Sequence, residues 1–272
     1  MSSASPKVAL IAVVAAAAAA CAQPSRTVRV CADPNNLPFS NAKLQGFENR
    51  IAELVGESLD ARIEYVWWAQ RRGFIRNTLR EGVCDAVMGV PAGLEMARTT
   101  APYYRSSYVF VTRRGSHQPA SFDDPYLATA TIGVHLIGDD FANSPPSHAL
   151  SARGITDNVR GYSIYGNYRQ PNPPAALIDA VAGGAIDVAV AWGPLAGYFA
   201  RTARVPLQLS RVRPDEEPPF PFAFDIAMGV ARTNHALQQE LDGVIERRRS
   251  DITRILRDYA VPVLRSEEVA VR

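Results

Sequence analysis

Short β-branched runs alternate with segments of helical hydrophobic spacing along most of this chain, and this alternation restricts the fold more than any other feature. Residues 27–31 form a first strand-like run, after which Phe47, Ile51 and Leu54 recur at helical spacing. The expected elements that follow are a strand over 63–68, a helix over 74–81 and a strand over 83–90. Strands that alternate with helices predict βαβ units and a parallel sheet.

The pattern restarts after a further strand over 108–112. The expected second set is a strand over 131–135, a helix over 141–150, a strand over 159–162, a helix over 175–181, a strand over 186–191 and a helix over 194–200. A proline-rich, charged connection at 211–221 then leads to a strand over 224–230. Leu237, Leu241 and the apolar residues that follow, to Tyr259, predict one long helix.

Two similar sets of elements predict an α/β fold of two lobes, each with a parallel or mixed sheet covered by helices. If the last strand and helix return to the first lobe, the chain crosses between lobes twice, near Thr112 and near Ala223. The expected division is a signal peptide at 1–22, lobe 1 at 23–113, lobe 2 at 114–222 and the lobe 1 return at 223–272.

The first residues have the pattern of a secretory signal peptide. Lys7 precedes an apolar stretch, and small residues up to Ala22 allow a cut ahead of Gln23. A cut before Cys21, with lipid on that cysteine, is the alternative, but Ala18 stands where a lipoprotein signal normally carries leucine. We expect a soluble periplasmic protein, because an alanine-rich stretch this short is a weak membrane anchor.

Removal of a leader leaves two cysteines, Cys31 and Cys84, in an oxidising compartment. We expect a disulfide between them, and two buried thiols are the alternative. Neither has a second metal-ligand residue at zinc-finger spacing, so no metal site is expected. The formal net charge of +2 is too small to indicate nucleic-acid binding.

No catalytic constellation is visible in the sequence. There is no G-x-S-x-G nucleophile elbow and no glycine-rich phosphate loop. His135 ends a predicted strand and is expected to face a cleft, whereas His117, His148 and His235 lie in loops or at a helix start. The acidic clusters at 123–124, 139–140 and 215–217 are interpreted as turns or helix caps. We therefore expect neither an enzyme nor a bound cofactor.

The ligand cleft of an open α/β sheet lies at the carboxyl ends of its strands. Those ends carry Asp33, Trp67-Trp68, Pro91, His135 and Trp192. The segment at 67–74 has two indoles followed by two guanidinium groups. Either one tryptophan packs in the core and the arginines are surface charges, or the group recognises an anionic or flat ligand or a protein partner.

Several motifs resemble periplasmic solute-binding proteins of the polar amino-acid type. They are Gly46-Phe47-Glu48, Cys84-Asp85-Ala86-Val87, Pro102-Tyr103-Tyr104 and Ile186-Asp187-Val188-Ala189-Val190. A closer resemblance is to one branch of that family, the accessory proteins encoded beside quinoprotein methanol dehydrogenases (MxaJ and XoxJ). The stretches that carry it are 30–40, 67–79, 88–93, 102–110 and 191–198. The likeness extends over nearly the whole mature chain.

The sequence departs from amino-acid receptors at the two positions that hold the ligand. Those receptors resemble one another in clamping the carboxylate with an arginine directly after a Thr-x-Glu segment, but here Met96 follows Glu95. They hold the ammonium with an acid five residues after the second-lobe aspartate, a position that is Trp192 here. A zwitterion buried without these partners is destabilised by several kcal/mol, so we expect no binding of free amino acids.

The resemblance implies a non-enzymatic periplasmic protein that assists assembly or activation of a PQQ-dependent methanol or alcohol dehydrogenase. The alternative is a receptor that delivers a small non-amino-acid ligand to an ABC transporter. Whether the cleft holds a ligand or a segment of the partner stays open at this point. The residues expected at the cleft are Asp33, Asn35, Trp67, Trp68, Arg71, Arg72, Pro91, Tyr103, Tyr104, His135, Trp192 and Tyr198.

Overall fold

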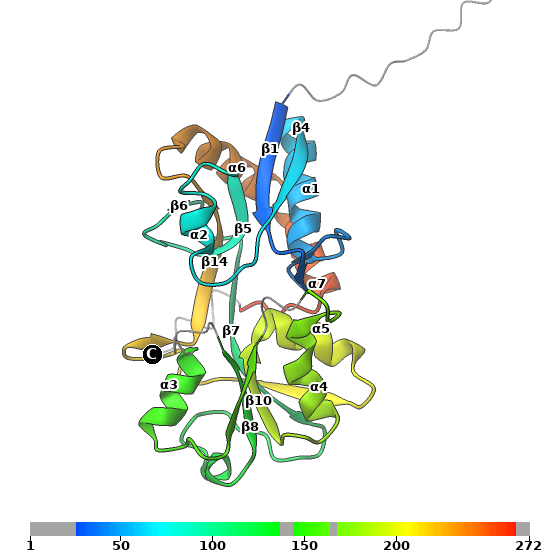
Figure 1. Cartoon of the computed structure of the whole chain (residues 1–272), viewed down its shortest axis with the longest axis vertical. Coiled ribbons are helices and arrows are strands. Elements are labelled where there is room, and N and C mark those ends of the chain that lie inside the picture. Colours follow the sequence, from blue (N-terminus) through cyan, green and yellow to red (C-terminus); the bar gives the residue numbers. More distant parts are fainter. Residues whose placement is uncertain (1–25, 137–143, 164–167, 265–272) are drawn as a thin grey trace, which may run out of the picture.

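The computed structural model describes residues 26–136, 144–163 and 168–264. Two α/β lobes lie one above the other, joined by long strands (Figure 1). The expected signal peptide, the alternative lipid site at Cys21 and the acidic pair at 139–140 lie outside the described residues. No helix in the described part is long and apolar enough to cross a membrane.

Lobe 1 is a sheet between two layers of helices. In the sheet, β1 (Arg26–Ala32) lies between β4 (Ala61–Trp67) and β5 (Ala86–Pro91), and β14 (Ala223–Val230) is antiparallel to β5. The helices α1 (Phe47–Leu59), α6 (His235–Arg247) and α7 (Arg249–Asp258) bury their apolar residues in one core. Side chains alternate across a strand, so Val30 joins that core while Cys31 packs on the opposite face with α2 (Phe74–Asn77).

Lobe 2 repeats the arrangement. Its parallel strands are β8 (Ile132–Leu136), β9 (Val159–Ser163) and β10 (Val188–Trp192). One core contains α4 (Ala176–Ala182) and α5 (Gly193–Thr202), and the other contains α3 (Pro145–Ala152) and the 3₁₀ helix η1 (Pro125–Ala128). The shorter elements are β2 (Asn35–Asn36), β3 (Ser40–Asn41), β6 (Arg98–Thr99), η2 (Pro173–Ala175), β12 (Glu216–Glu217) and β13 (Phe220–Pro221).

One strand belongs to both lobes. The first residues of β7 (Tyr104–Arg113) pair with β14, and the later residues pair with β10 and with β11 (Leu207–Arg211). The two expected sheets are therefore joined through β7 into one mixed sheet, which has ten strands among the described residues. The predicted α/β two-lobed fold and its two crossings, along β7 and β14, are confirmed.

Three local predictions were wrong. The helix expected over 74–81 ends at Asn77, where the Thr78 hydroxyl donates to the Phe74 carbonyl at 2.6 Å. The long C-terminal helix is two helices, because Arg248 leaves the helical conformation at φ −106° and ψ 19°. Strand β11 was not predicted, although Leu207 and Leu209 alternate with polar residues as in a half-buried strand.

The Cys31–Cys84 disulfide is confirmed. It joins β1 to the residue two positions before β5, with 5.7 Å between the Cα atoms, within the usual range for a disulfide. Both cysteines are buried among the apolar residues on the α2 face of lobe 1. The bridge ties together the strands whose carboxyl ends face lobe 2.

Candidate functional site

Asp33 organises the lobe 1 surface that faces lobe 2. It follows β1 directly, and it is buried at 1% exposure. One carboxylate oxygen accepts the Asn35 N–H and the other accepts the Gln70 N–H, each at 2.8 Å. Burial raises the pKa of Asp33 above its ordinary value, and the two N–H donors oppose that rise. Both oxygens are therefore used to hold the loops after β1 and β4.

The loop after β1 reaches across to lobe 2. The Asn35 side chain donates to the Gln170 carbonyl at 2.8 Å and accepts from the Asn172 N–H at 3.4 Å. Leu37, 6% exposed, packs in the lobe 2 core with residues of α4 and α5. This loop closes one side of the space between the lobes.

Helix α5 of lobe 2 makes a second contact between the lobes, with the residues that follow α7. The Tyr198 ring stacks on Tyr259 at 5.8 Å between centroids, and the Tyr259 hydroxyl donates to the Gln45 carbonyl at 2.6 Å. A side chain on Gly197 would clash with the Ala260 carbonyl, at 2.0 Å. We call this contact the buried seam: Leu37 is buried in it, and Asn35, Tyr198, Tyr259 and Ala260 around it are half-buried.

A pocket of about 580 Å³ lies beside the buried seam. It is lined by both lobes: Pro34, Asn35, Leu37, Asn41, Ala42, Lys43 and Gln45 from lobe 1, and Tyr168, Arg169, Gln170, Pro171 and Asn172 from lobe 2. The described residues of this lining include Lys43 and Arg169 but no aspartate or glutamate. It therefore offers no carboxylate to a ligand's ammonium group.

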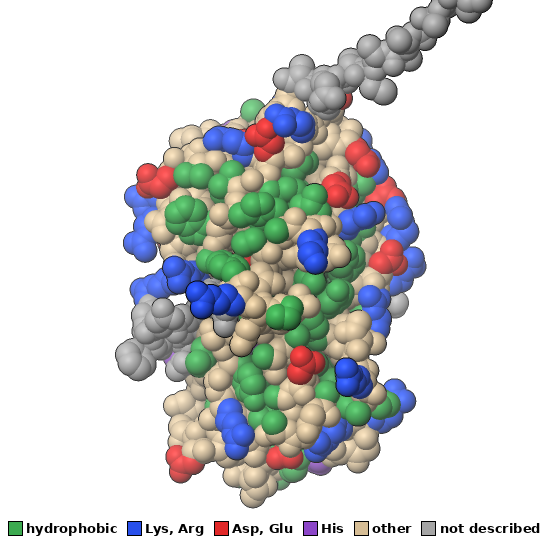
Figure 2. Space-filling view, turned by 45° about the vertical axis from the view of Figure 1, so that its right-hand side comes forward, with side chains coloured by type: hydrophobic (Ala, Val, Ile, Leu, Met, Phe, Trp, Pro, Cys, Tyr) green, Lys and Arg blue, Asp and Glu red, His purple; other side chains and the backbone are tan. Residues whose placement is uncertain are grey.

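The segment after β4 forms a different kind of surface. The Trp67 ring stacks on Tyr65 at 4.8 Å, whereas Trp68 is 42% exposed. Arg71 and Arg72 are also exposed. We call Trp67, Trp68, Arg71 and Arg72 the open rim. Figure 2 shows a face on which hydrophobic side chains extend from the upper lobe across the junction to the lower lobe, with Lys and Arg side chains around them.

Trp192 lies at the junction itself. It ends β10 opposite Tyr108 of β7, and its ring contacts Tyr108 at 5.5 Å and Phe224 at 5.7 Å, both edge to face. Phe224 belongs to β14, the second crossing strand. Trp192 thus packs against both strands that join the lobes.

Tyr103 and Tyr104 do not lie at a cleft rim, contrary to the expectation from the sequence. Both are buried in the lobe 1 core, at 8% and 6% exposure. The Tyr103 hydroxyl donates to the Met88 carbonyl at 2.7 Å. Glu48 is buried beside them, and burial raises its pKa to about 8. Tyr104 begins β7 and Tyr103 precedes it, and both rings are packed in this core, so neither is accessible to a partner.

Pro91 ends β5 as expected and is exposed, whereas His135 is the last residue but one of β8, which ends at Leu136. His135 is 5% exposed, and burial lowers its pKa to about 4, so the ring is neutral at pH 7. Its Nε2 atom has no hydrogen-bond partner among the described residues. Within the described residues, no nucleophile is paired with this histidine.

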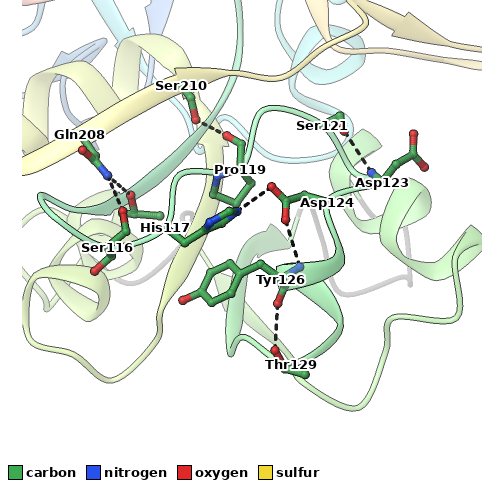
Figure 3. Close-up of polar contacts among 11 residues, drawn as sticks. Ser116, His117, Pro119, Ser121, Asp123, Asp124, Tyr126, Thr129, Gln208 and Ser210 are labelled. Atoms are coloured by element: carbon green, nitrogen blue, oxygen red, sulfur yellow. Dashed lines mark hydrogen bonds and ion pairs between the residues drawn. The ribbon is translucent and has the colours of Figure 1, made fainter.

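A second histidine forms an acid pair far from the junction. His117 Nε2 lies 2.8 Å from an Asp124 oxygen, and the other oxygen accepts the Tyr126 N–H at 3.0 Å, which caps η1 (Figure 3). Although burial opposes it, hydrogen bonding to His117 lowers the pKa of Asp124. The interpretation of residues 123–124 as a cap is confirmed for Asp124. Among described residues, no three potential metal-ligand side chains gather.

Arg98, the first arginine after Glu95, lies far from the junction. Arg98 donates from Nε to the Arg232 carbonyl at 3.0 Å, beyond the far end of β14 from the junction. Met96 is 49% exposed and lines a separate pocket with Arg80 and Thr233. Neither side chain lines the pocket between the lobes.

Sequence reasoning missed three residues of this site. Leu37, Tyr168 and Tyr259 were not expected at the interlobe surface, because each meets partners that are distant in the chain. Leu37 carries a detectable signal, since it is the one large apolar residue within a turn-rich loop.

Known proteins share this fold. No family model matches the chain. Protein MoxJ of Methylorubrum extorquens AM1 is 33% identical over 253 residues, which cover 88% of this chain and 82% of that protein. The periplasmic binding protein XoxJ of Methylobacterium extorquens AM1 is 36% identical, with a TM-score of 0.72 over 88% of this chain and 100% of that one.

MxaJ of Methylophaga aminisulfidivorans MPT has the same fold, with a TM-score of 0.76, 24% identity and coverage of 88% of this chain and 100% of that one. The identity to MoxJ, its coverage and the likeness to XoxJ agree with the fold described above. On this evidence the chain belongs to the MoxJ family of periplasmic binding-protein-like proteins.

Proposed function

We propose that this chain is a periplasmic, non-enzymatic protein of methanol oxidation that assists assembly or activation of a PQQ-dependent methanol or alcohol dehydrogenase. Membership of the MoxJ family and the likeness to a periplasmic binding protein support the compartment and the association with methanol oxidation. The buried seam is the observation on which we base the accessory role. Leu37 and Asn35 join the two lobes beside the interlobe pocket.

The open rim is the surface that we assign to the partner. Tryptophan and arginine are enriched among the residues that dominate protein–protein binding energy. The exposed Trp68 and the neighbouring Arg71 are available without disturbing the core. Binding there leaves the buried seam intact.

The first test is genetic and biochemical. Deletion of the gene should lower dehydrogenase activity in cells, and the wild-type gene should restore it. In a pull-down with purified dehydrogenase, Trp68→Ala should weaken binding by about 2 kcal/mol, or roughly thirtyfold. Met96→Ala, which also truncates an exposed apolar side chain, should bind normally. Unchanged dehydrogenase activity in the deletion strain would refute the proposal.

One observation favours a second function, a receptor for a small anion. The interlobe pocket is lined by Lys43 and Arg169 with no carboxylate. A ligand at saturating concentration raises the melting temperature by mass action. A shift with small carboxylates or phosphate would place this function first, whereas free amino acids should cause none.

A further inference from the structure

Strand β4 leaves one edge of the lobe 1 sheet open. It is the terminal strand of the sheet and pairs only with β1 among the described residues. The Trp68 N–H donates to Ala32 of β1 at 2.9 Å. Backbone groups alternate in direction along a strand, so Ile63, Tyr65 and Trp67 direct their N–H and C=O groups toward the open edge. An open edge is a template for pairing with another strand.

The two ends of β4 differ in shape. At its start, a groove of about 470 Å³ is lined by Gly56, Ala61 and Ile63, with acidic side chains of α1 on its wall. At its end, the stacked Tyr65 and Trp67 rings lie on the face of the sheet that α1 covers. The Tyr65 hydroxyl shows this, because it donates to the Asn49 carbonyl of α1 at 3.3 Å. The groove therefore extends from the start of β4 to Tyr65, which lines its far end.

The charged side chains of β4 would lie opposite side chains of the other sign in a second β4 strand that runs antiparallel to it. Arg62 and Glu64 flank Ile63, form an ion pair with each other, and have side chains that are 57% and 43% exposed. In an antiparallel pair of identical strands centred on Ile63, Arg62 of each copy lies opposite Glu64 of the other. Centring the pair on Glu64 would place like charges opposite each other, which is destabilising.

We propose that β4 is the contact between two copies of this chain, paired antiparallel about Ile63. This register places Tyr65 of the second copy opposite Ala61, so its ring enters the groove at the start of the first strand. A two-fold axis relates the two copies, so Tyr65 of the first copy makes the same contact with Ala61 of the second, as in other isologous interfaces. The charge pairs, the groove and the open backbone edge select the same arrangement. The proposal does not depend on the proposed function.

Charge-swapped variants test this register directly. Arg62→Glu gives a chain with two acids at the edge, and Glu64→Arg gives a chain with two arginines. Sedimentation equilibrium should show a dimer for the wild type and dimerisation weakened roughly tenfold or more in each variant. An equimolar mixture of the two variants should form heterodimers, because every opposed pair is then acid against base. Arg114→Glu, an equal charge change on an exposed turn of lobe 2, should dimerise as the wild type does.

Three results would overturn the proposal. The wild type could sediment as a monomer at every concentration, or both swapped variants could dimerise normally. The third is a monomer whose binding to the dehydrogenase is lost with Arg62→Glu, which would assign the edge to a different protein. Melting curves of the variants check that both fold, as exposed substitutions should.

Discussion

The buried seam and the open rim begin on neighbouring loops, after β1 and β4, but they differ in burial. At the seam, Leu37 enters the core of the other lobe and Tyr259 stacks on Tyr198. At the rim, Trp68 and Arg71 are exposed and contribute little to the core. Asp33 connects the two, with one oxygen on the seam loop and the other on the rim loop. The comparison separates the residues that join the lobes from those of the proposed partner surface.

Among the variants that test this comparison, the one without the disulfide should lose the most unfolding free energy. Cys31 and Cys84 are separated by 53 residues, and the chain-entropy model assigns such a loop about 4 kcal/mol. We expect the Cys31→Ser/Cys84→Ser variant to lose that much unfolding free energy, measured in urea. Both seam and rim should loosen, since both depend on β1. Mass spectrometry of unreduced wild-type protein should show the two cysteine peptides linked, and free thiols there would contradict the prediction.

Truncation at the seam should have the next largest effect. Leu37→Ala removes a buried side chain and should lower the unfolding free energy by about 3 kcal/mol. Leu44→Ala, the same change at a leucine that is 37% exposed, should cost less than about 0.5 kcal/mol. Small-angle scattering should show a more open Leu37→Ala protein. Equal losses for the two variants would mean that Leu37 does not hold the lobes together.

The sequence predicted the fold better than the site, for a physical reason. Hydrophobic periodicity is local, so most of the strands and helices could be predicted from a few neighbouring residues. Trp192 could be placed because it ends a predicted strand. The burial of Leu37 depends on the other lobe, and the inward direction of Tyr103 and Tyr104 depends on the register of β7 with β14. The continuous apolar stripe of the last helices likewise conceals their break at Arg248.

A smaller effect should follow from Asp33→Asn. An amide has one acceptor oxygen in place of two, so one of the two loop N–H bonds is lost, at about 1 to 2 kcal/mol. The pH dependence should change as well. Because burial raises the pKa of Asp33 in the folded state, its contribution to stability is complete below the ordinary aspartate pKa and is lost as pH rises through the raised value. Melting curves across this range should fall more steeply for the wild type than for the variant.

The smallest effect on stability should come from the open rim. Trp68→Ala removes a side chain that is 42% exposed, and we expect a change in unfolding free energy of less than about 0.5 kcal/mol. The same substitution at Trp192 removes rings packed against Tyr108 and Phe224 and should cost about 2 kcal/mol or more. Urea unfolding of the two variants therefore separates a structural tryptophan from a surface one. If Trp68→Ala were as destabilising as Trp192→Ala, the rim would belong to the core, and any loss of dehydrogenase binding in that variant would reflect unfolding.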